Sequence, residues 1–201
     1  ELFVVESGQG ESRVRVASLK AVVRLKPVGD GEPDDEEANY IDSRNEAPTD
    51  PIAALRQPRE YVVRLYVLQG INLMPLDVGS ASDPYLKVVL GRTTIDTRDR
   101  YIKDATTAHF HEFFELRTQL PGESMLRIEC IDYDSFGRRS DDLIGATEID
   151  LEDRWFSCHW RDELSDKPPV EWRSLHSKLS KHPQGVLELW LEILSPAAAE
   201  A

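Results

Sequence analysis

Short runs of alternating apolar and polar residues recur along this chain, and turn residues separate them. Residues 186–194 alternate most regularly, with leucine or isoleucine at every second position. A period of two is typical of a strand that is buried on one face. The same pattern predicts further strands at residues 60–68, 84–91, 92–95, 112–116, 125–131, 143–148 and 170–175. Many short strands with turns between them predict an all-β antiparallel sandwich.

Three segments depart from this pattern. Residues 150–165 space their apolar residues as a helix does, and Asp150 stands where an N-cap is expected. We therefore expect a short helix inserted between late strands. Residues 13–25 predict a strand added to the sandwich, and residues 196–201 are expected to form a frayed tail.

Acidic residues are concentrated in one segment. Residues 30–50 hold nine acids and one base, so they supply −8 of the formal charge of −13. Prolines at positions 33, 48, 51 and 58 interrupt the same region. Such a composition cannot bury enough apolar surface to offset ordering. We therefore expect an N-terminal extension (1–27), an acidic Pro-containing linker (28–58), a main domain (59–195) and the tail (196–201).

Composition also limits the partners and the compartment. A net negative charge argues against nucleic acid as a partner. The chain has two cysteines, Cys130 and Cys158, which is too few for a disulfide framework and suits a reducing compartment. No apolar run is long enough to span a membrane. The chain opens with Glu1 rather than Met, so we expect it to be a piece of a longer protein.

Aspartates gather where two predicted strands meet loops. Asp77 follows one apolar run, and Asp83 precedes the next. About fifty residues later the run 125–131 is followed by Asp132 and Asp134, and a second pair, Asp141 and Asp142, precedes another strand. Ca²⁺ takes six to eight oxygen ligands and tolerates irregular cages built from loops. A single aspartate at a strand end usually serves the turn itself. Five at two strand ends, counting one of the pair Asp141 and Asp142, favour a cation site.

This arrangement resembles C2 domains. The sequence Asp83-Pro84-Tyr85 lies six positions after Asp77, and Asp132-Tyr133-Asp134 follows later. Further segments resemble the C2 domains of ferlins, large membrane-anchored proteins of vesicle fusion and membrane repair. Those segments are 18–20, 101–116 and 149–154. The resemblance implies an eight-stranded antiparallel β-sandwich of type II topology.

The resemblance also implies a site. Its Ca²⁺ ligands would be Asp77, Asp83, Asp132, Asp134 and Asp142, with Asp141 as the neighbour in reserve. The loop between Asp134 and Asp142 is about two residues longer than in common members of the family. Membrane-contacting residues would be Val78, Phe136, Arg138 and Arg139. A weaker suggestion places phosphoinositide at Tyr85 and Lys87. The second basic set, however, is interleaved with acids and is better interpreted as a solvated face: Lys87, Arg92, Arg98, Arg100 and Lys103.

The implied function is a Ca²⁺-dependent phospholipid-binding module of a ferlin-like trafficking or fusion protein. It would dock on anionic membrane at the cytoplasmic face of membranes or vesicles, as part of a larger membrane-anchored protein. The isolated domain is expected to be monomeric, with other trafficking proteins as further partners. Two alternatives stay open: a Ca²⁺-independent protein-interaction module, and the targeting domain of a lipid-signalling enzyme.

No catalytic set is evident in the sequence. It has no Gly-rich phosphate loop and no nucleophile elbow. His109 and His111 share one face of a strand but lack a third ligand, so zinc is not expected. The four tryptophans, at positions 155, 160, 172 and 190, are expected in the core. We therefore expect a binding module and no enzyme.

Overall fold

A computed structural model describes residues 2–7, 14–20, 57–76, 79–135, 141–155, 169–178 and 180–200. The chain divides into two compact units, Glu1–Ala47 and Pro48–Ala201. The first contains β1 (Leu2–Ser7) and β2 (Val14–Lys20), which pair antiparallel as a two-stranded sheet. A strand therefore forms within 13–25, but it is not added to the sandwich as expected: it pairs with β1, which was not predicted, in a separate sheet. Most of the predicted linker, through residue 56, lies outside the described residues.

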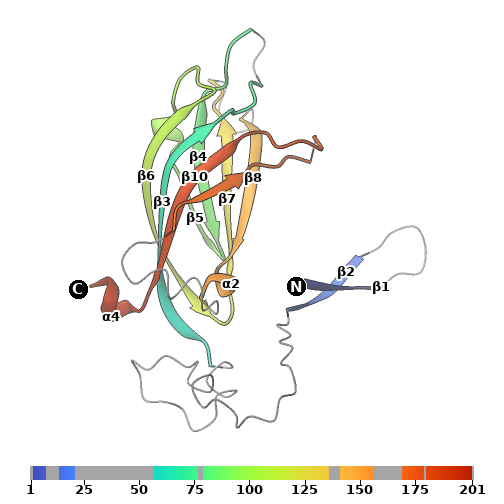
Figure 1. Ribbon diagram of the computed structural model, residues 1–201, viewed down its shortest axis with the longest axis vertical. Helices are drawn as coiled ribbons and strands as arrows, with labels where there is room; N and C mark the ends of the chain where they lie inside the picture. The colour runs from blue at the N-terminus through green and yellow to red at the C-terminus, as the bar shows by residue number, and fades with distance from the viewer. Residues whose placement is uncertain are drawn as a thin grey trace, which may run out of the picture. The chain divides into compact units, whose positions relative to one another are not determined.

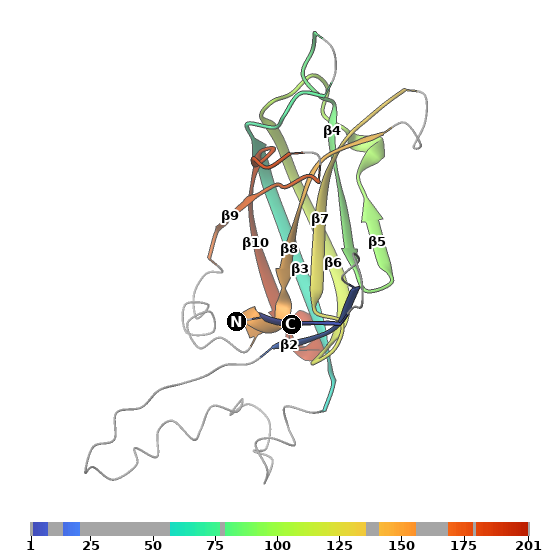
Figure 2. The same ribbon diagram turned by 90° about the vertical axis from the view of Figure 1, so that its right-hand side faces the viewer.

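The second unit contains two four-stranded antiparallel sheets packed as a sandwich (Figures 1 and 2). One sheet has the order β6-β3-β10-β9 and the other β5-β4-β7-β8. The eight strands are β3 (Arg59–Ile71), β4 (Pro84–Leu90), β5 (Thr93–Asp96), β6 (Ala108–Leu120), β7 (Met125–Asp132), β8 (Asp142–Asp150), β9 (Glu171–Ser174) and β10 (Val186–Leu194). The predicted sandwich of eight strands is confirmed.

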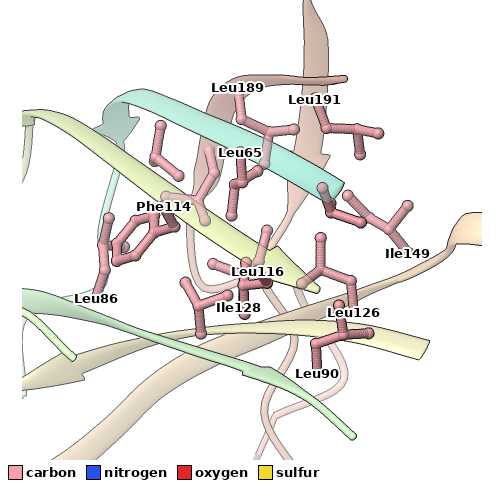
Figure 3. Close-up of a cluster of buried hydrophobic side chains, with 14 of the residues drawn as sticks. Leu65, Leu86, Leu90, Phe114, Leu116, Leu126, Ile128, Ile149, Leu189 and Leu191 are labelled. Carbon is pink, nitrogen blue, oxygen red and sulfur yellow. The ribbon is translucent and has the colours of Figure 1, made fainter. Parts of the chain in front are cut away.

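The core lies between the two sheets, and the alternation along the strands determines which side chains fill it. Leu65, Leu116 and Leu189 come from the first sheet, and Leu86 and Ile128 come from the second (Figure 3). Every one of these five side chains is buried. Burial of a leucine or isoleucine side chain contributes roughly 1.5–3 kcal/mol, so this interface carries most of the stability.

One backbone bridge joins the sheets at their edges. Ala146 of β8 and His176 exchange backbone hydrogen bonds of 2.8 and 2.9 Å. The close approach depends on Gly145, because a Cβ there would lie 2.9 Å from the Cβ of Leu175. The bridge therefore ties the middle of β8 to the segment that follows β9.

The short helix also forms. α2 (Leu151–Trp155) begins directly after β8, and the Asp150 carboxylate accepts a hydrogen bond of 3.0 Å from the Glu152 amide. This is the N-cap that the sequence predicted. Residues 156–168, with Trp160 and the rest of the predicted helix, lie outside the described residues.

Two expectations about the C-terminal part were wrong. The tail is not frayed over its whole length: α4 (Pro196–Ala199) follows Ser195, whose hydroxyl accepts from the Ala198 amide. Neither Trp172 nor Trp190 is in the core: Trp172 on edge strand β9 is 56% exposed, and Trp190 lies on the outward face of β10 and is partly exposed.

Candidate functional site

Three connections meet at one end of the sandwich: residues 72–83 between β3 and β4, 97–107 between β5 and β6, and 133–141 between β7 and β8. The first begins at Asn72, whose positive φ of 53° bends the chain away from β3. Its backbone is then tied to the β5–β6 connection, because the Leu73 amide donates to the Thr106 carbonyl, and to the segment before β10, because the Met74 amide donates to the Gln184 carbonyl. The site is therefore assembled from segments distant in sequence.

The two aspartate loops are joined directly. The backbone amide of Asp83 donates to the Asp132 carboxylate at 2.6 Å. The amide of Tyr133 returns a bond of 3.0 Å to the Asp83 carbonyl. Asp132 is 4% exposed, whereas Asp134 is only partly buried. The predicted neighbours Asp83 and Asp132 therefore come together, as an antiparallel pairing of β4 with β7 requires.

The β5–β6 connection orients the Asp83 carboxylate. The amide of Asp104 donates to Asp83 Oδ1 at 2.7 Å, and the Asp104 carboxylate accepts from the Ala81 amide at 2.8 Å. Asp104 has a φ of 51°, a left-handed conformation in which aspartate is several-fold enriched. This residue was not singled out from the sequence, where it counted only as one of several interleaved acids.

Beneath the second aspartate loop, which is the β7–β8 connection, Arg98 and Asp141 form a bidentate ion pair. Arg98 Nε and Nη2 donate to the two Asp141 oxygens at 2.6 and 2.9 Å, and Nη2 also reaches the Asp134 carbonyl at 2.9 Å. The Asp141 side chain is 2% exposed and that of Arg98 is 16% exposed. The expectation that Arg98 belongs to a solvated mixed face was therefore wrong.

Hydrogen bonds explain the electrostatics of Asp141. The Arg98 guanidinium lowers the pKa of the Asp141 carboxyl to about 2, against opposing desolvation. The Asp134 amide and the Tyr85 hydroxyl, both 3.0 Å away, act in the same direction. The pKa of Tyr85 is raised, first by burial and then by this hydrogen bond. Asp141 is thus a saturated acceptor, held ionised by a fixed internal cation.

Aromatic rings complete the support of this ion pair. The Arg98 guanidinium lies 4.2 Å from the centre of the Tyr133 ring. Tyr133 also stacks on Tyr101 at 4.0 Å with nearly parallel planes. The ring of Tyr133 therefore connects the second loop to the β5–β6 connection.

The remaining predicted residues are divided between described and undescribed positions. Asp142 begins β8 and is exposed. Lys87 forms an ion pair of 3.0 Å with Glu129, and Tyr85 is buried, so both residues of the suggested phosphoinositide site have partners within the fold. Asp77, Val78, Phe136, Arg138 and Arg139 lie outside the described residues.

The donor set has the chemistry of a hard-cation site. Asp83, Asp132, Asp134 and Asp142 offer carboxylate oxygens only, as Ca²⁺ prefers. Within the described part of the chain, no three acid, histidine or cysteine side chains lie close enough together to hold a metal ion. The four described candidates therefore do not form a metal-binding group by themselves, and the fifth candidate, Asp77, lies outside the described residues.

A groove lies beside this end, between edge strands β8 and β9, with a volume of about 1150 Å³. Its lining includes Leu76 and Leu143, the cationic residues Arg173 and Lys178, and the carboxylate of Asp142. The apolar and cationic lining thus adjoins the predicted ligand Asp142. The described residues include no helix long and apolar enough to cross a bilayer.

Comparison with known proteins identifies the relatives of this chain. The family model "C2 domain" matches residues 61–175. Myoferlin of Mus musculus is 43% identical over 100 residues, which are 50% of this chain and 5% of myoferlin. Fer-1-like protein 4 of Mus musculus is 41% identical over 103 residues, 51% of this chain and 5% of that protein. The resemblance to ferlins is confirmed, and this chain spans about a twentieth of these relatives.

Solved structures give the same fold. A single C2 domain of plant extended synaptotagmin 1 aligns with a TM-score of 0.55 at 19% identity, over 70% of this chain and 98% of that one. A calcium-bound pair of C2 domains from extended synaptotagmin 2 aligns with a TM-score of 0.53 at 26% identity, over 69% of this chain and 47% of that one. The described geometry thus corresponds to a known sandwich.

Proposed function

This chain belongs to the C2 domain family, and from that premise we propose that it is a Ca²⁺-dependent phospholipid-binding module. In this proposal two aspartate-bearing loops hold Ca²⁺ and dock on anionic membrane. The extended synaptotagmin 2 relative, a calcium-bound pair of C2 domains, supports the choice of ion. The module binds and does not catalyse.

The observation that carries the proposal is the direct link between the two loops. The Asp83 amide donates to the Asp132 carboxylate at 2.6 Å, across 49 positions of sequence. Because of this link, carboxylates of both loops lie at one end of the sandwich. One cation could then take oxygens from each loop, which separated aspartates at turns could not provide.

The ligands in this proposal are Asp77, Asp83, Asp132, Asp134 and Asp142. Asp141 stays in reserve, since its two oxygens already accept from Arg98, Tyr85 and the Asp134 amide. Bound Ca²⁺ supplies positive charge that cancels the mutual repulsion of the carboxylates and attracts anionic headgroups. The chain's own contribution is orientation: the amides of Asp83 and Asp104 hold the Asp132 and Asp83 carboxylates.

Membrane contact is assigned to the tips of the same loops. Val78 follows the first ligand, and Phe136 lies two positions after Asp134, where an apolar side chain could insert. Arg138 and Arg139 follow and would lie near headgroups, each contributing about 1 kcal/mol at an anionic surface. The similarity to myoferlin supports a place in a larger membrane-anchored trafficking or fusion protein, at the cytoplasmic face of membranes or vesicles.

Liposome sedimentation tests this proposal. The 201-residue protein is spun with phosphatidylserine-containing vesicles in millimolar Ca²⁺ and in chelator. We expect it to pellet with the vesicles only when Ca²⁺ is present, and to stay in the supernatant with neutral phosphatidylcholine vesicles. Equal sedimentation in Ca²⁺ and in chelator would contradict the proposal.

A Ca²⁺-independent protein-interaction module is the second candidate, and one observation favours it. Arg98 already supplies a cation to the loop end, where it binds Asp141 and the Asp134 carbonyl. A loop end so neutralised could keep its shape without Ca²⁺. If Ca²⁺ changes neither the melting temperature nor vesicle binding, this candidate takes first place.

A further inference from the structure

An aromatic row crosses the outward face of the sheet β6-β3-β10-β9, away from the loop end. It consists of Phe113, Tyr66 and Trp190, which are direct neighbours in the strand register. The rings of Tyr66 and Phe113 are 5.0 Å apart, and those of Tyr66 and Trp190 are 4.8 Å apart. Figure 1 shows the three strands side by side. The row is therefore a continuous aromatic surface.

Part of this face is covered and part is not. α4 packs against β3 and β10, and Arg64 Nη2 donates to the Ala199 carbonyl at 2.7 Å. Val62, which also faces outward, is only 2% exposed. Two positions beyond Arg64 lies Tyr66, the middle of the aromatic row. Its neighbour on β6, Phe113, is 50% exposed. Cross-strand aromatic pairs stabilise a sheet, but that role does not require half of a phenylalanine to face solvent.

Two carboxylates flank Trp190, at one end of the row. Glu188 and Glu192 lie two positions before and after Trp190, on the same face of β10. Each accepts from a neutral donor: Glu188 from the Gln69 amide at 2.6 Å, and Glu192 from the Tyr66 hydroxyl at 3.4 Å. Within the described ranges neither forms an ion pair. The nearby Arg64 is paired with Glu115 at 3.0 Å.

We propose that the aromatic row, with Glu188 and Glu192, binds a segment of a partner protein that carries arginine or lysine among apolar residues. The evidence is charge complementarity: aromatic faces attract cations, and two carboxylates that form no ion pair among the described residues lie beside them. One of them, Glu192, lies opposite Arg64, which is already paired with Glu115. Three strands span about 10 Å between their outer axes, so the row can contact several side chains of an extended segment. An anionic membrane would be repelled by the same carboxylates. The acidic residues 30–50 of this chain would also be repelled.

The test uses the full chain and a defined probe. A peptide of about a dozen residues that alternates Arg and Leu, long enough to cross the row as an extended strand, is titrated into ¹⁵N-labelled protein in chelator. The indole N–H signal of Trp190 is followed, and a peptide alternating Gln and Leu is the matched neutral probe. We expect the first peptide to shift the Trp190 signal saturably, with weaker binding at higher salt because exposed charges are screened. The neutral peptide is expected to leave the signal in place.

Variants distinguish this surface from general attraction to an acidic protein. Glu188→Gln with Glu192→Gln is expected to bind the Arg–Leu peptide about fivefold more weakly, as exposed charge pairs contribute modestly. Glu60→Gln with Glu148→Gln removes the same total charge from exposed positions outside the row and is expected to bind like the parent. Phe113→Ser, at a half-exposed position, is expected to weaken binding while lowering the melting temperature only slightly, since one cross-strand aromatic pair is lost.

Several results would overturn the inference. If the Glu188/Glu192 variant and its control bind the Arg–Leu peptide equally well, the carboxylates have no role in binding. If the neutral peptide also shifts the Trp190 indole signal, charge does not determine binding. A shift of Trp190 by phosphatidylcholine vesicles, with none from the peptide, would assign the row to a choline headgroup. None of these results depends on Ca²⁺, so they are independent of the loop proposal.

Discussion

Asp83 and Asp141 lie in neighbouring loops at the same end of the sandwich, but their carboxylates have different partners. Asp141 is almost fully buried and accepts two bonds from the Arg98 guanidinium. Asp83 is partly exposed, and its carboxylate accepts from the Asp104 backbone amide. The first carboxylate has a resident cation and the second has none among the described residues.

This difference separates two uses of aspartate that look alike in sequence. Both residues stand beside the start of a strand, and both belong to a set with carboxylates nearby. A bidentate arginine fixes position and charge together, so Asp141 serves the loop framework. A carboxylate held by backbone amides keeps its negative charge available. The comparison therefore predicts that neutral substitutions at the two sites will have different consequences.

The largest effect is expected for Asp83→Asn combined with Asp134→Asn. Asparagine keeps an oxygen that can accept from the Asp104 amide, so the fold should persist while two ligand charges are lost. The parent should gain about 2.7 kcal/mol of stability at a hundredfold excess of Ca²⁺ over Kd. The double variant should gain none and should no longer bind liposomes. Thermal melts in Ca²⁺ and in chelator measure this.

Asp141→Asn is the matched control in those melts. It should lower the melting temperature in both media, because Arg98 then lacks its anionic partner, and it should keep the rise caused by Ca²⁺. The distinction between the two aspartates is wrong if Asp141→Asn abolishes that rise while the double variant retains it.

Phe136→Ala should give the next largest effect, and only at the membrane. Burial of a phenylalanine side chain is worth roughly 1.5–3 kcal/mol, or about 10- to 150-fold in vesicle affinity if insertion is complete. The Ca²⁺-dependent rise in melting temperature should not change. Vesicle titrations at two salt concentrations provide the measurement.

The same titrations separate charge from insertion. Raised salt should reproduce the effect of Arg138→Gln with Arg139→Gln, because screening acts on exposed charges. It should not reproduce the effect of Phe136→Ala. If Phe136→Ala binds vesicles like the parent, the tip of the second loop does not insert.

A smaller effect is expected from acid, and it concerns Asp141 alone. Its pKa is lowered from 3.8 to about 2 in the folded protein, so the ion pair stabilises fully above the ordinary value. That stabilisation is lost as pH falls from about 4 towards 2. In chelator, the stability advantage of the parent over Asp141→Asn should therefore be constant from about pH 7 to 5 and shrink below about pH 4. An advantage that does not change down to about pH 2 would show that Arg98 does not hold the carboxylate ionised.

The smallest effect is expected from deleting residues 30–50. This segment carries more acids than the loops do, but acid content without a shared geometry does not make a cation site. The melting temperature and its rise in Ca²⁺ should both stay within error of the parent. A reduced rise would mean that the segment takes part in binding the ion.

The sequence predicted strands best where alternation was unbroken. β10 was predicted at its observed bounds, because every second residue of 187–193 is leucine or isoleucine. β6 was predicted to begin at Glu112 but begins at Ala108. The cause is His111, whose φ of 49° interrupts the alternation near a register shift opposite Val67 and Gln69. A strand prediction that relies on a period of two cannot detect such an irregularity.

The site was harder to predict than the fold. Spacing placed Asp83 and Asp132 at strand ends that pair, and the structure brings them together. Spacing could not reveal that Arg98, 43 positions before Asp141, folds beneath the second loop. Its neighbours Arg100 and Lys103 are exposed, so the sequence around it suggested a solvated face. Only the tertiary contact with Tyr133 and Asp141 distinguishes it.

The hydrogen bond from the Asp134 amide to the Asp141 carboxylate closes the second loop at its base. A loop closed at its base can change length without moving the strands that carry it. Each doubling of a flexible loop costs only about 0.6 kcal/mol in closure entropy. A peptide inserted between Asp134 and Asp141 should therefore be accommodated without loss of the sandwich.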